Sequence, residues 1–293
     1  MTDTLSATRI GPAEFSWGAR TFVMGIVNAT PDSFSGDGIL ADDVESDPVA
    51  AAVAQGRRMV ADGADLLDVG GESTRPGHAT VDAAEEQRRV VPVVSALRAA
   101  LPDTPISIDT TKPEVADAAL AAGADLVNDV WGVHADDGLV RVAAARDAPL
   151  VVMHNRAEPR YDHLMAEVVE DLRVALDRAV RLGIPTNRLI VDPGFGFGKT
   201  PEHNLTLLRE LGALRVLGRP IVLGTSRKST LGLVLDLSVE ERLEATLATT
   251  ALGIANGADV VRVHDVRANV RAARITDAVV RGWRPDGQQE GAR

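Results

Sequence analysis

The stretch ADGADLLDVGG (residues 61–71) recurs later in the chain as AAGADLVNDVWG (121–132) and as ANGADVVRVHDV (255–266). In each copy a helical segment stops at a glycine, and an apolar run follows it. Glycine readily adopts the left-handed conformation that closes a helix. The apolar runs lack the polar alternation of a half-exposed strand, so each is expected to be a strand buried on both faces. The repeat therefore predicts helices and strands that alternate around a parallel sheet.

Eight apolar runs of this kind occur along the chain, at residues 22–28, 66–71, 105–110, 126–130, 149–154, 189–194, 220–226 and 259–265. Between them lie segments whose apolar residues recur three and four apart, as in 164–182, which is typical of helices. The first and last runs begin at residues 22 and 259, an average of about 34 residues per strand-helix unit. This pattern predicts an α/β fold of the TIM (β/α)8 barrel type.

The barrel is expected to span residues 21–282, between a short N-terminal cap (1–20) and a flexible tail (283–293). Residues 8–20 of the cap are expected to cross the bottom of the barrel. The alternative is a doubly wound open sheet that binds a dinucleotide. That fold needs GxGxxG directly after its first strand, where this chain reads GIVNATPDSF. The barrel is therefore preferred.

Composition excludes several classes of partner and site. The formal net charge of −11 argues against a nucleic-acid surface, because a duplex binder needs a basic face. No apolar run reaches the length of a membrane span, and the N-terminus lacks the features of a signal peptide, so a cytoplasmic protein is expected. The chain has no cysteine, which excludes disulfides and thiolate metal sites.

Three polar residues end apolar strands: Asp109, Asn128 and Asp192. In a TIM barrel these ends meet at one mouth, where function is located. A carboxylate there is desolvated unless a hydrogen-bond donor reaches it. The 2-amino-4-oxo-pyrimidine edge of a heterocycle offers adjacent N–H donors that a carboxylate accepts in pairs. The alternative is that each acid caps the following helix or pairs with an arginine of a loop.

Basic residues follow the last two predicted strands. Arg227 and Lys228 come after the seventh strand and Arg262 after the eighth, where barrels commonly bind phosphate at a helix N-terminus. A solvated turn is the alternative for the Arg-Lys pair. Two long polar loops, at 28–38 and 70–77, are expected to close over the site, unless they are only surface turns.

The segment DPGFGFGKT (192–200) ends like a nucleotide-binding P-loop, but Pro193 stands where that pattern needs its first glycine. Its glycines instead allow the backbone to turn tightly around a flat ligand, with Phe195 or Phe197 offering a ring face. Lys199 and Thr200 are expected to begin the next helix.

Seven segments in chain order, between residues 24 and 266, resemble the dihydropteroate synthases: MGIVNATPDSFS, DVGGESTRPG, SIDTTKPEVA, LVNDV, DPGFGFGKT, SRKS and RVHDV. The resemblance implies a pterin-binding TIM barrel that is homodimeric and depends on Mg²⁺. Its reaction would join 6-hydroxymethyl-7,8-dihydropterin pyrophosphate to p-aminobenzoate. Small-molecule substrates are therefore the expected partners.

The resemblance also implies roles for individual residues. The expected pterin contacts are Asp109, Asn128, Asp192 and Lys228. Asn28 is similar to the Mg²⁺ ligand, and the expected diphosphate-binding residues besides it are Arg75, Arg262 and His264. The expected p-aminobenzoate contacts are Thr74, Phe197 or Phe195, Arg227 and Ser229. Of these residues, Arg75, Lys228 and Asp109 are expected to be catalytic.

Three departures from the family pattern leave alternatives open. The first loop reads SGDG at 35–38, Trp131 replaces a small residue and could crowd the pterin pocket, and the loop at 153–164 lacks the usual Gly and Met. The chain could therefore be a diverged, non-catalytic pterin-binding paralogue. A pterin-dependent methyltransferase is a further alternative, although such an enzyme has no reason to keep STRPG and SRKS.

Overall fold

The computed structural model describes residues 5–29, 47–72, 81–131 and 137–282 and contains one eight-stranded parallel sheet. Its strands are β3 (Phe22–Asn28), β4 (Leu66–Gly70), β5 (Ile106–Asp109), β6 (Leu126–Asp129), β7 (Leu150–Met153), β8 (Leu189–Asp192), β9 (Val222–Leu223) and β10 (Val260–Val263). The strand order is β8-β7-β6-β5-β4-β3-β10-β9, and a parallel bridge between Val191 and Ile221 joins the two edges. The predicted TIM barrel is confirmed.

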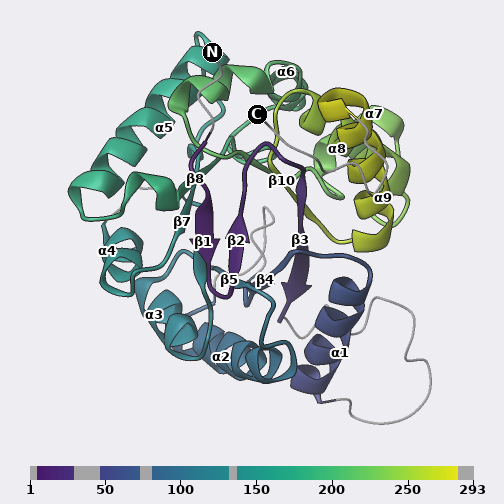
Figure 1. Ribbon diagram of the computed structural model, residues 1–293. Helices are drawn as coiled ribbons and strands as arrows, with labels where there is room; N and C mark the ends of the chain where they lie inside the picture. The colour runs from purple at the N-terminus through teal and green to yellow at the C-terminus, as the bar shows by residue number, and fades with distance from the viewer. Residues whose placement is uncertain (1–4, 30–46, 73–80, 132–136, 283–293) are drawn as a thin grey trace, which may run out of the picture.

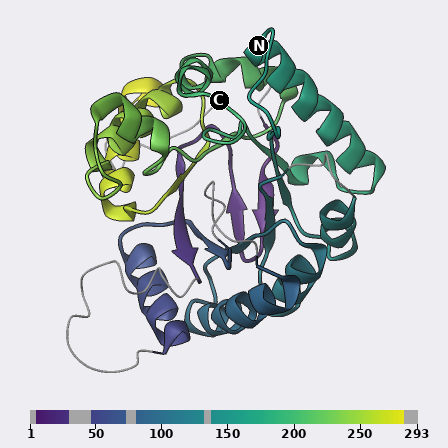
Figure 2. The same cartoon turned by 180° about the vertical axis from the view of Figure 1, so that it is seen from behind.

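Helices surround the strands in a ring, which Figures 1 and 2 show from opposite sides. They are α1 (Pro48–Ala61), α2 (Ala83–Ala100), α3 (Pro113–Ala121), α4 (Gly138–Ala145), α5 (Leu164–Arg181), α6 (Pro201–Arg209), α7 (Ser229–Leu235), α8 (Leu243–Ala255) and α9 (Val266–Asp277). Two 3-10 helices, η2 (Thr186–Arg188) and η3 (Leu211–Leu217), precede β8 and β9, and α9 continues into a π-helix, η4 (Ala278–Gly282). In the described ranges, no helix is both long and apolar enough to cross a bilayer.

Each copy of the sequence repeat performs the same structural task. Gly63, Gly123 and Gly257 all have positive φ angles, between 103° and 115°, as a left-handed helix end requires. The aspartate two residues later accepts a backbone N–H at the start of a neighbouring strand. The bonds are Val23 N to Asp65 Oδ2 (2.7 Å), Ile106 N to Asp125 Oδ2 (2.9 Å) and Ile221 N to Asp259 Oδ2 (3.0 Å). The repeat therefore ends a helix and fastens the adjoining strand.

Two apolar cores lie on the two sides of the sheet. Because successive side chains of a strand point to opposite faces, Leu126 packs inside the barrel and Val127 packs against the helices. The inner core lies toward the N-terminal ends of the strands. It leaves the C-terminal half of the barrel interior to polar side chains.

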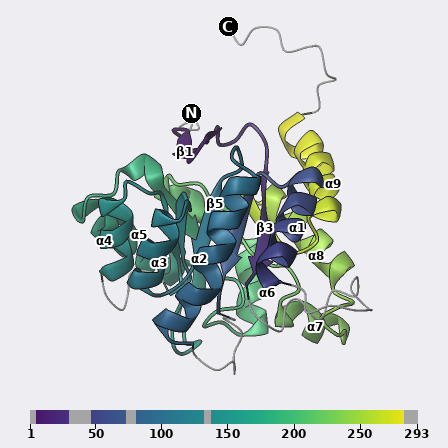
Figure 3. The same ribbon diagram turned by 90° about the horizontal axis from the view of Figure 1, so that it is seen from below.

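An N-terminal hairpin closes the bottom of the barrel. Strands β1 (Thr8–Ile10) and β2 (Ala13–Phe15) pair antiparallel, and Phe15 and Trp17 join the inner core beside Phe22. The ring centroids of Phe15 and Phe22 lie 4.7 Å apart, and Trp17 Nε1 donates to the Thr8 hydroxyl at 2.9 Å. Figure 3 shows this hairpin at one end of the barrel and α7 at the other. Ligand access is therefore confined to the opposite, C-terminal mouth.

The seventh strand is much shorter than predicted. Residues 220–226 were expected to form it, but β9 contains only Val222 and Leu223, with one further bridge at Ile221. Pro220 has no N–H to donate, and Gly224 brings no side chain to pack against neighbouring strands. The chain consequently leaves the sheet early and enters the turn that carries Arg227 and Lys228.

Candidate active site at the barrel mouth

The three polar strand ends lie together at the C-terminal mouth, as predicted. Asp109, Asn128 and Asp192 end or nearly end β5, β6 and β8, and they are 8%, 4% and 7% exposed. Asp109 and Asn128 are direct partners in the sheet register. None of the three caps a helix, so the capping alternative is wrong for these residues.

A mostly buried arginine connects three of the strands. Arg262 on β10 donates from Nε to Asp68 Oδ2 and from Nη2 to Asp109 Oδ2, both at 2.5 Å. Asn128 Nδ2 donates to the same oxygen of Asp68 at 3.1 Å. Charged pairs of this kind tolerate burial only when hydrogen bonds fix their geometry. Arg262 therefore does pair with acids, and it takes one of the two oxygens of Asp109.

Asp68 is a site residue that the sequence analysis missed. It lies inside β4 and is fully buried, with Ser107 as its register partner on β5. The available signal was a polar residue within an apolar run, two residues after Leu66 and therefore on the same inward face. Asp68 was not predicted because only polar residues at the ends of strands were considered.

Three buried polar atoms at this site have no hydrogen-bond partner among the described residues. They are Asp68 Oδ1, Ser107 Oγ and Asp109 Oδ1. An unpaired buried acceptor costs about 1–3 kcal/mol, so native proteins usually satisfy such groups with water or ligand. Asp109 in particular retains one acceptor oxygen that a ligand N–H can occupy.

Burial dominates the titration of both mouth carboxyl groups. It raises the pKa of Asp109 to about 7, although the nearby charges of Arg262 and Lys228 oppose this shift. Burial also raises the pKa of Asp192, against the backbone N–H of Gly194, which donates to Asp192 Oδ1 at 2.7 Å. Lys228 acts electrostatically on both carboxyl groups, so its ammonium lies on the same side of the molecule as they do.

The basic segment after β9 has a fixed geometry. Arg227 adopts a left-handed φ of 56°, and its guanidinium donates twice to Asp265, at 3.1 and 2.8 Å. Lys228 Nζ lies 3.9 Å from the centre of the Phe197 ring. His264 Nδ1 contacts the Ser226 hydroxyl at 2.9 Å, and the exposed Ser229 begins α7. The Arg-Lys pair is therefore an ordered part of the mouth rather than a solvated turn.

The glycines of residues 192–200 provide close packing between loops. Gly194, Gly196 and Gly198 have φ angles of 70°, 82° and 53°. A Cβ on Gly194 would lie 1.8 Å from the carbonyl oxygen of His154, which excludes any side chain there. Thr200 caps α6, as predicted, by accepting from His203 N at 3.2 Å.

The structure distinguishes between the two phenylalanines of this segment. Phe195 is 1% exposed and belongs to the core between strands and helices, so it cannot present a ring face to a ligand. Phe197 is partly exposed and lies beside Lys228. Of the two expected candidates, only Phe197 is placed to contact a substrate.

Other expected site residues are partly or wholly beyond the described ranges. Thr74, Arg75 and the SGDG segment at 35–38 lie outside them. Asn28 ends β3 and is partly buried, and the described ranges contain no group of three potential metal ligands. Trp131 is 48% exposed and therefore does not fill the barrel interior, so the expected crowding of the pocket finds no support.

The fold and this mouth define an enzyme of the TIM-barrel class whose C-terminal mouth brings buried carboxylates and fixed cations together. Residues 24–264 match the family described as pterin binding enzyme. A dihydropteroate synthase of Clostridium beijerinckii is 48% identical over 274 residues, covering 93% of this chain and 99% of the relative.

Solved structures of dihydropteroate synthases are also similar to this chain. A dihydropteroate synthase of Clostridium difficile, solved in the presence of pteroic acid, is 47% identical with a TM-score of 0.86, covering 91% of this chain and 99% of that one. The Xanthomonas albilineans enzyme with 4-aminobenzoic acid is 42% identical with a TM-score of 0.85, covering 94% and 98%. The chain belongs to the dihydropteroate synthase family of pterin-binding transferases.

Asp68→Asn is expected to weaken pterin binding at least tenfold while the protein stays folded. The substitution leaves Arg262 buried with a single carboxylate, and such a loss typically costs about 2–5 kcal/mol in a binding site. Isothermal titration with pteroic acid measures the effect. The matched control is Asp65→Asn, which breaks the 2.6 Å bridge to Arg20 at the other end of the barrel. Equal affinities in Asp68→Asn and wild type would remove Asp68 from the site.

Pterin affinity is expected to increase as pH rises from about 6 to about 7.5. With a pKa raised to about 7, Asp109 is mostly protonated at the lower pH. It then cannot accept from Arg262 on one oxygen and from a pterin N–H on the other. It ionises as pH rises, so the dissociation constant should fall several-fold. Asp109→Asn should abolish this dependence. A flat profile in the wild type would show that Asp109 keeps one charge state throughout.

Proposed function

We propose that this chain carries out the reaction of its family, the condensation of 6-hydroxymethyl-7,8-dihydropterin pyrophosphate with p-aminobenzoate to 7,8-dihydropteroate and diphosphate. The observation that carries the proposal is the buried Asp109 Oδ1, which has no hydrogen-bond partner among the described residues and lies beside Asn128 and Asp192 at the same mouth as Arg262 and Lys228. This combination suits a flat ligand with N–H donors along one edge and an anionic tail.

The pterin is proposed to bind at the buried acceptors. Its amino group and ring N–H would donate to Asp109 and Asp192, and Asn128 can both accept and donate. Lys228 would donate to a pterin acceptor while its charge keeps both carboxylates ionised in the complex. Asp68 would hold Arg262 in place by the bond described above.

The diphosphate and the arylamine are proposed to bind on the outer side of the pterin. Arg262 and His264 would hold the diphosphate together with Arg75. Phe197, Arg227 and Ser229 would contact p-aminobenzoate together with Thr74. Arg227 is the charge complement of the benzoate carboxylate, and its contact with Asp265 keeps it oriented before substrate binds.

The chemistry requires the site to stabilise a leaving anion and exclude water. The amine nitrogen forms a bond to the pterin methylene carbon as the bond between that carbon and the diphosphate oxygen breaks. Diphosphate leaves with the electron pair, and the amine releases a proton. Fixed cations such as Arg262 stabilise the developing negative charge without reorganising.

Mg²⁺ is proposed as the cofactor, with Asn28 as its protein ligand. Mg²⁺ commonly uses one or two protein oxygens and completes its shell with water and substrate phosphates. The side-chain oxygen of Asn28, at the end of β3 on the same mouth, fits this limited role. When bound, the ion would neutralise charge on the diphosphate.

The synthase is favoured over the two alternatives by specific residues. A pterin-dependent methyltransferase would share the buried acceptors but would not need Arg227 and Phe197 positioned for an arylamine. A non-catalytic pterin-binding paralogue would keep the pterin contacts, Lys228 included, but would likewise not need Arg227 oriented for an arylamine carboxylate. A cytoplasmic location is also proposed, because the pterin pyrophosphate and p-aminobenzoate are small water-soluble substrates.

Diphosphate release is expected only when p-aminobenzoate is present, in a coupled assay with the pterin pyrophosphate and Mg²⁺. Asp109→Ala and Lys228→Ala should each reduce turnover by at least a hundredfold, because each removes a charged contact to the reacting substrate. Asp103→Ala, at an exposed turn at the other end of the strands, is the control. Release that does not require p-aminobenzoate would contradict the proposed reaction.

A homodimer is proposed through the face formed by α8 and α9. Leu252, Ile275 and Val279 are 55%, 64% and 77% exposed and lie near the C-terminal ends of these two packed helices and in η4. Exposed apolar side chains grouped in this way commonly mark an interface. A second copy of the chain is the partner that the family resemblance implies.

Light scattering coupled to size exclusion is expected to give a dimer for the wild type at micromolar concentration and a monomer for Ile275→Glu. A buried charge at an apolar interface is strongly unfavourable. Val216→Glu is the matched control, since Val216 is 76% exposed but lies in η3. A dimer that persists in Ile275→Glu would contradict an interface formed by α8 and α9.

A further inference from the structure

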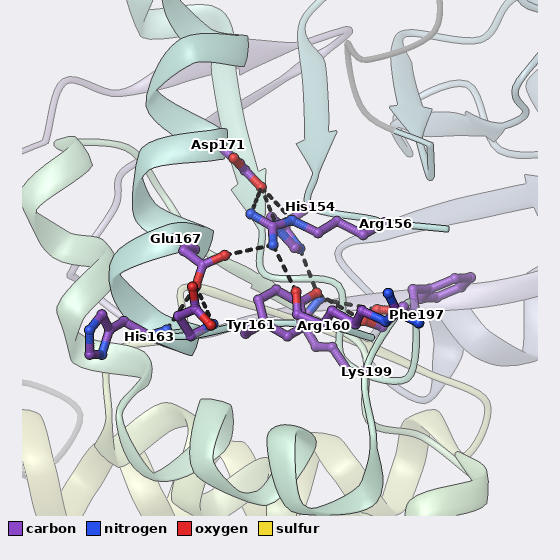
Figure 4. Close-up of polar contacts among 11 residues, drawn as sticks. His154, Arg156, Arg160, Tyr161, His163, Glu167, Asp171, Phe197 and Lys199 are labelled. Carbon is purple, nitrogen blue, oxygen red and sulfur yellow. Dashed lines mark hydrogen bonds and ion pairs between the residues drawn. The ribbon is translucent and has the colours of Figure 1, made fainter. Parts of the chain in front are cut away.

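A polar cluster lies behind the segment that carries Phe197, and the proposed reaction leaves it without a role. Figure 4 shows it between β7, the start of α5 and the β8–α6 segment. Its members are His154, Arg156, Tyr161, Glu167, Asp171 and Lys199. Three of them, His154, Arg156 and Tyr161, come from 153–164, the loop that departs from the family pattern.

Lys199 is the member that connects this cluster to the active site. Its Nζ donates to the carbonyl oxygen of Phe197 at 3.1 Å and contacts His154 Nδ1 at 2.9 Å. A lysine nitrogen inside a protein normally requires such partners, because burial disfavours its charged form. Burial lowers the pKa of Lys199 to about 7.

The partners of His154 define its protonation. Asp171 pairs with Arg156 as a carboxylate and can only accept, so His154 Nε2–H donates to Asp171 Oδ2 at 3.1 Å and Nδ1 is left to accept from Lys199. Burial, with the charge of Lys199, lowers the pKa of His154 to about 3, so the ring stays neutral. Arg156 Nε also donates to Asp171 Oδ2, at 2.9 Å, and Arg156 Nη1 donates to Glu167 at 2.7 Å. The chain of bonds therefore anchors Lys199 to helix α5.

Both backbone polar groups of Phe197, its N–H and its carbonyl, form hydrogen bonds. Its N–H donates to Gly194 O at 3.0 Å, and its carbonyl accepts from Lys199. The preceding Gly196 packs on Lys228, since a Cβ there would lie 3.0 Å from Lys228 Cδ. The ring of Phe197 then lies against Lys228 Nζ, as described above. A shift of the Phe197 peptide would therefore move the ring away from Lys228.

We propose that Lys199 is a positioning residue for the arylamine substrate: its bond to the Phe197 carbonyl fixes the Phe197 ring beside Lys228 and thereby sets the affinity for p-aminobenzoate. The proposal rests on the function proposed above. It gives Lys199 no contact with substrate and no part in bond making. Of the proposed pterin contacts, Asp109 and Asn128 lie on β5 and β6, away from this segment, and Asp192 is held by the Gly194 N–H rather than by Lys199, so their contribution should be largely retained.

Steady-state kinetics of Lys199→Met in the full chain provides the first test. Methionine keeps most of the side-chain volume but cannot donate to the Phe197 carbonyl. The KM for p-aminobenzoate should rise about tenfold, which is the order expected for one lost hydrogen bond. The KM for the pterin pyrophosphate should change less than threefold, and kcat should be retained within threefold.

Two further variants separate positioning from general loosening of the segment. Lys199→Gln keeps an N–H donor without the charge and should recover part of the affinity for p-aminobenzoate. Tyr161→Phe removes the 2.8 Å bond to Gly198 O in the same segment without touching the Phe197 peptide, and should stay within twofold of wild type. An equal rise in KM for Tyr161→Phe would mean that loosening alone is responsible, which would overturn the proposal.

A crystal structure of Lys199→Met tests the inference independently of turnover. The Phe197 ring should leave its position beside Lys228, and an unmoved ring would overturn the proposal even if the kinetics change. Failure of the wild type to consume p-aminobenzoate would instead contradict the proposed function. An active wild type with an unchanged KM in Lys199→Met would contradict only the role of Lys199.

Discussion

The candidate active site depends on one mostly buried guanidinium that lies between two carboxylates. Arg262 brings a fixed positive charge into the barrel interior and connects β10 to β4 and β5 through Asp68 and Asp109. The arrangement is costly, because all three charged groups lose hydration and the network leaves Asp68 Oδ1 and Asp109 Oδ1 without partners in the described part of the chain. A sequence selected for stability alone would favour apolar residues here. The incomplete network is best explained by a ligand that completes it.

The N-terminal end of the barrel contributes mainly to stability, and the C-terminal end carries the polar residues of the candidate site. At the N-terminal end, the hairpin aromatics join the inner core, and the aspartates of the three repeats accept backbone N–H groups at the starts of strands. At the C-terminal end the side chains of the same strands become charged or polar. Close packing of the apolar half provides the rigidity that a preorganised polar half requires.

Much of this organisation could be predicted from the sequence. Glycine stops, apolar runs and their spacing predicted the barrel, and polar residues at strand ends predicted Asp109, Asn128 and Asp192, because parallel strands place those ends on one side. Asp68 was missed because it lies within a strand rather than at its end. The choice between Phe195 and Phe197 depended on which ring faces the core, and the contact between Lys199 and His154 joins residues 45 positions apart. Neither follows from local spacing.

A crystal structure of the chain with a bound pterin is the most direct measurement of the central claim. The account predicts that the ring N–H and amino groups lie about 3 Å from Asp109 Oδ1 and from Asp192, so that the ligand supplies the missing donors. A pterin bound elsewhere, or an Asp109 Oδ1 satisfied only by water in the complex, would contradict it.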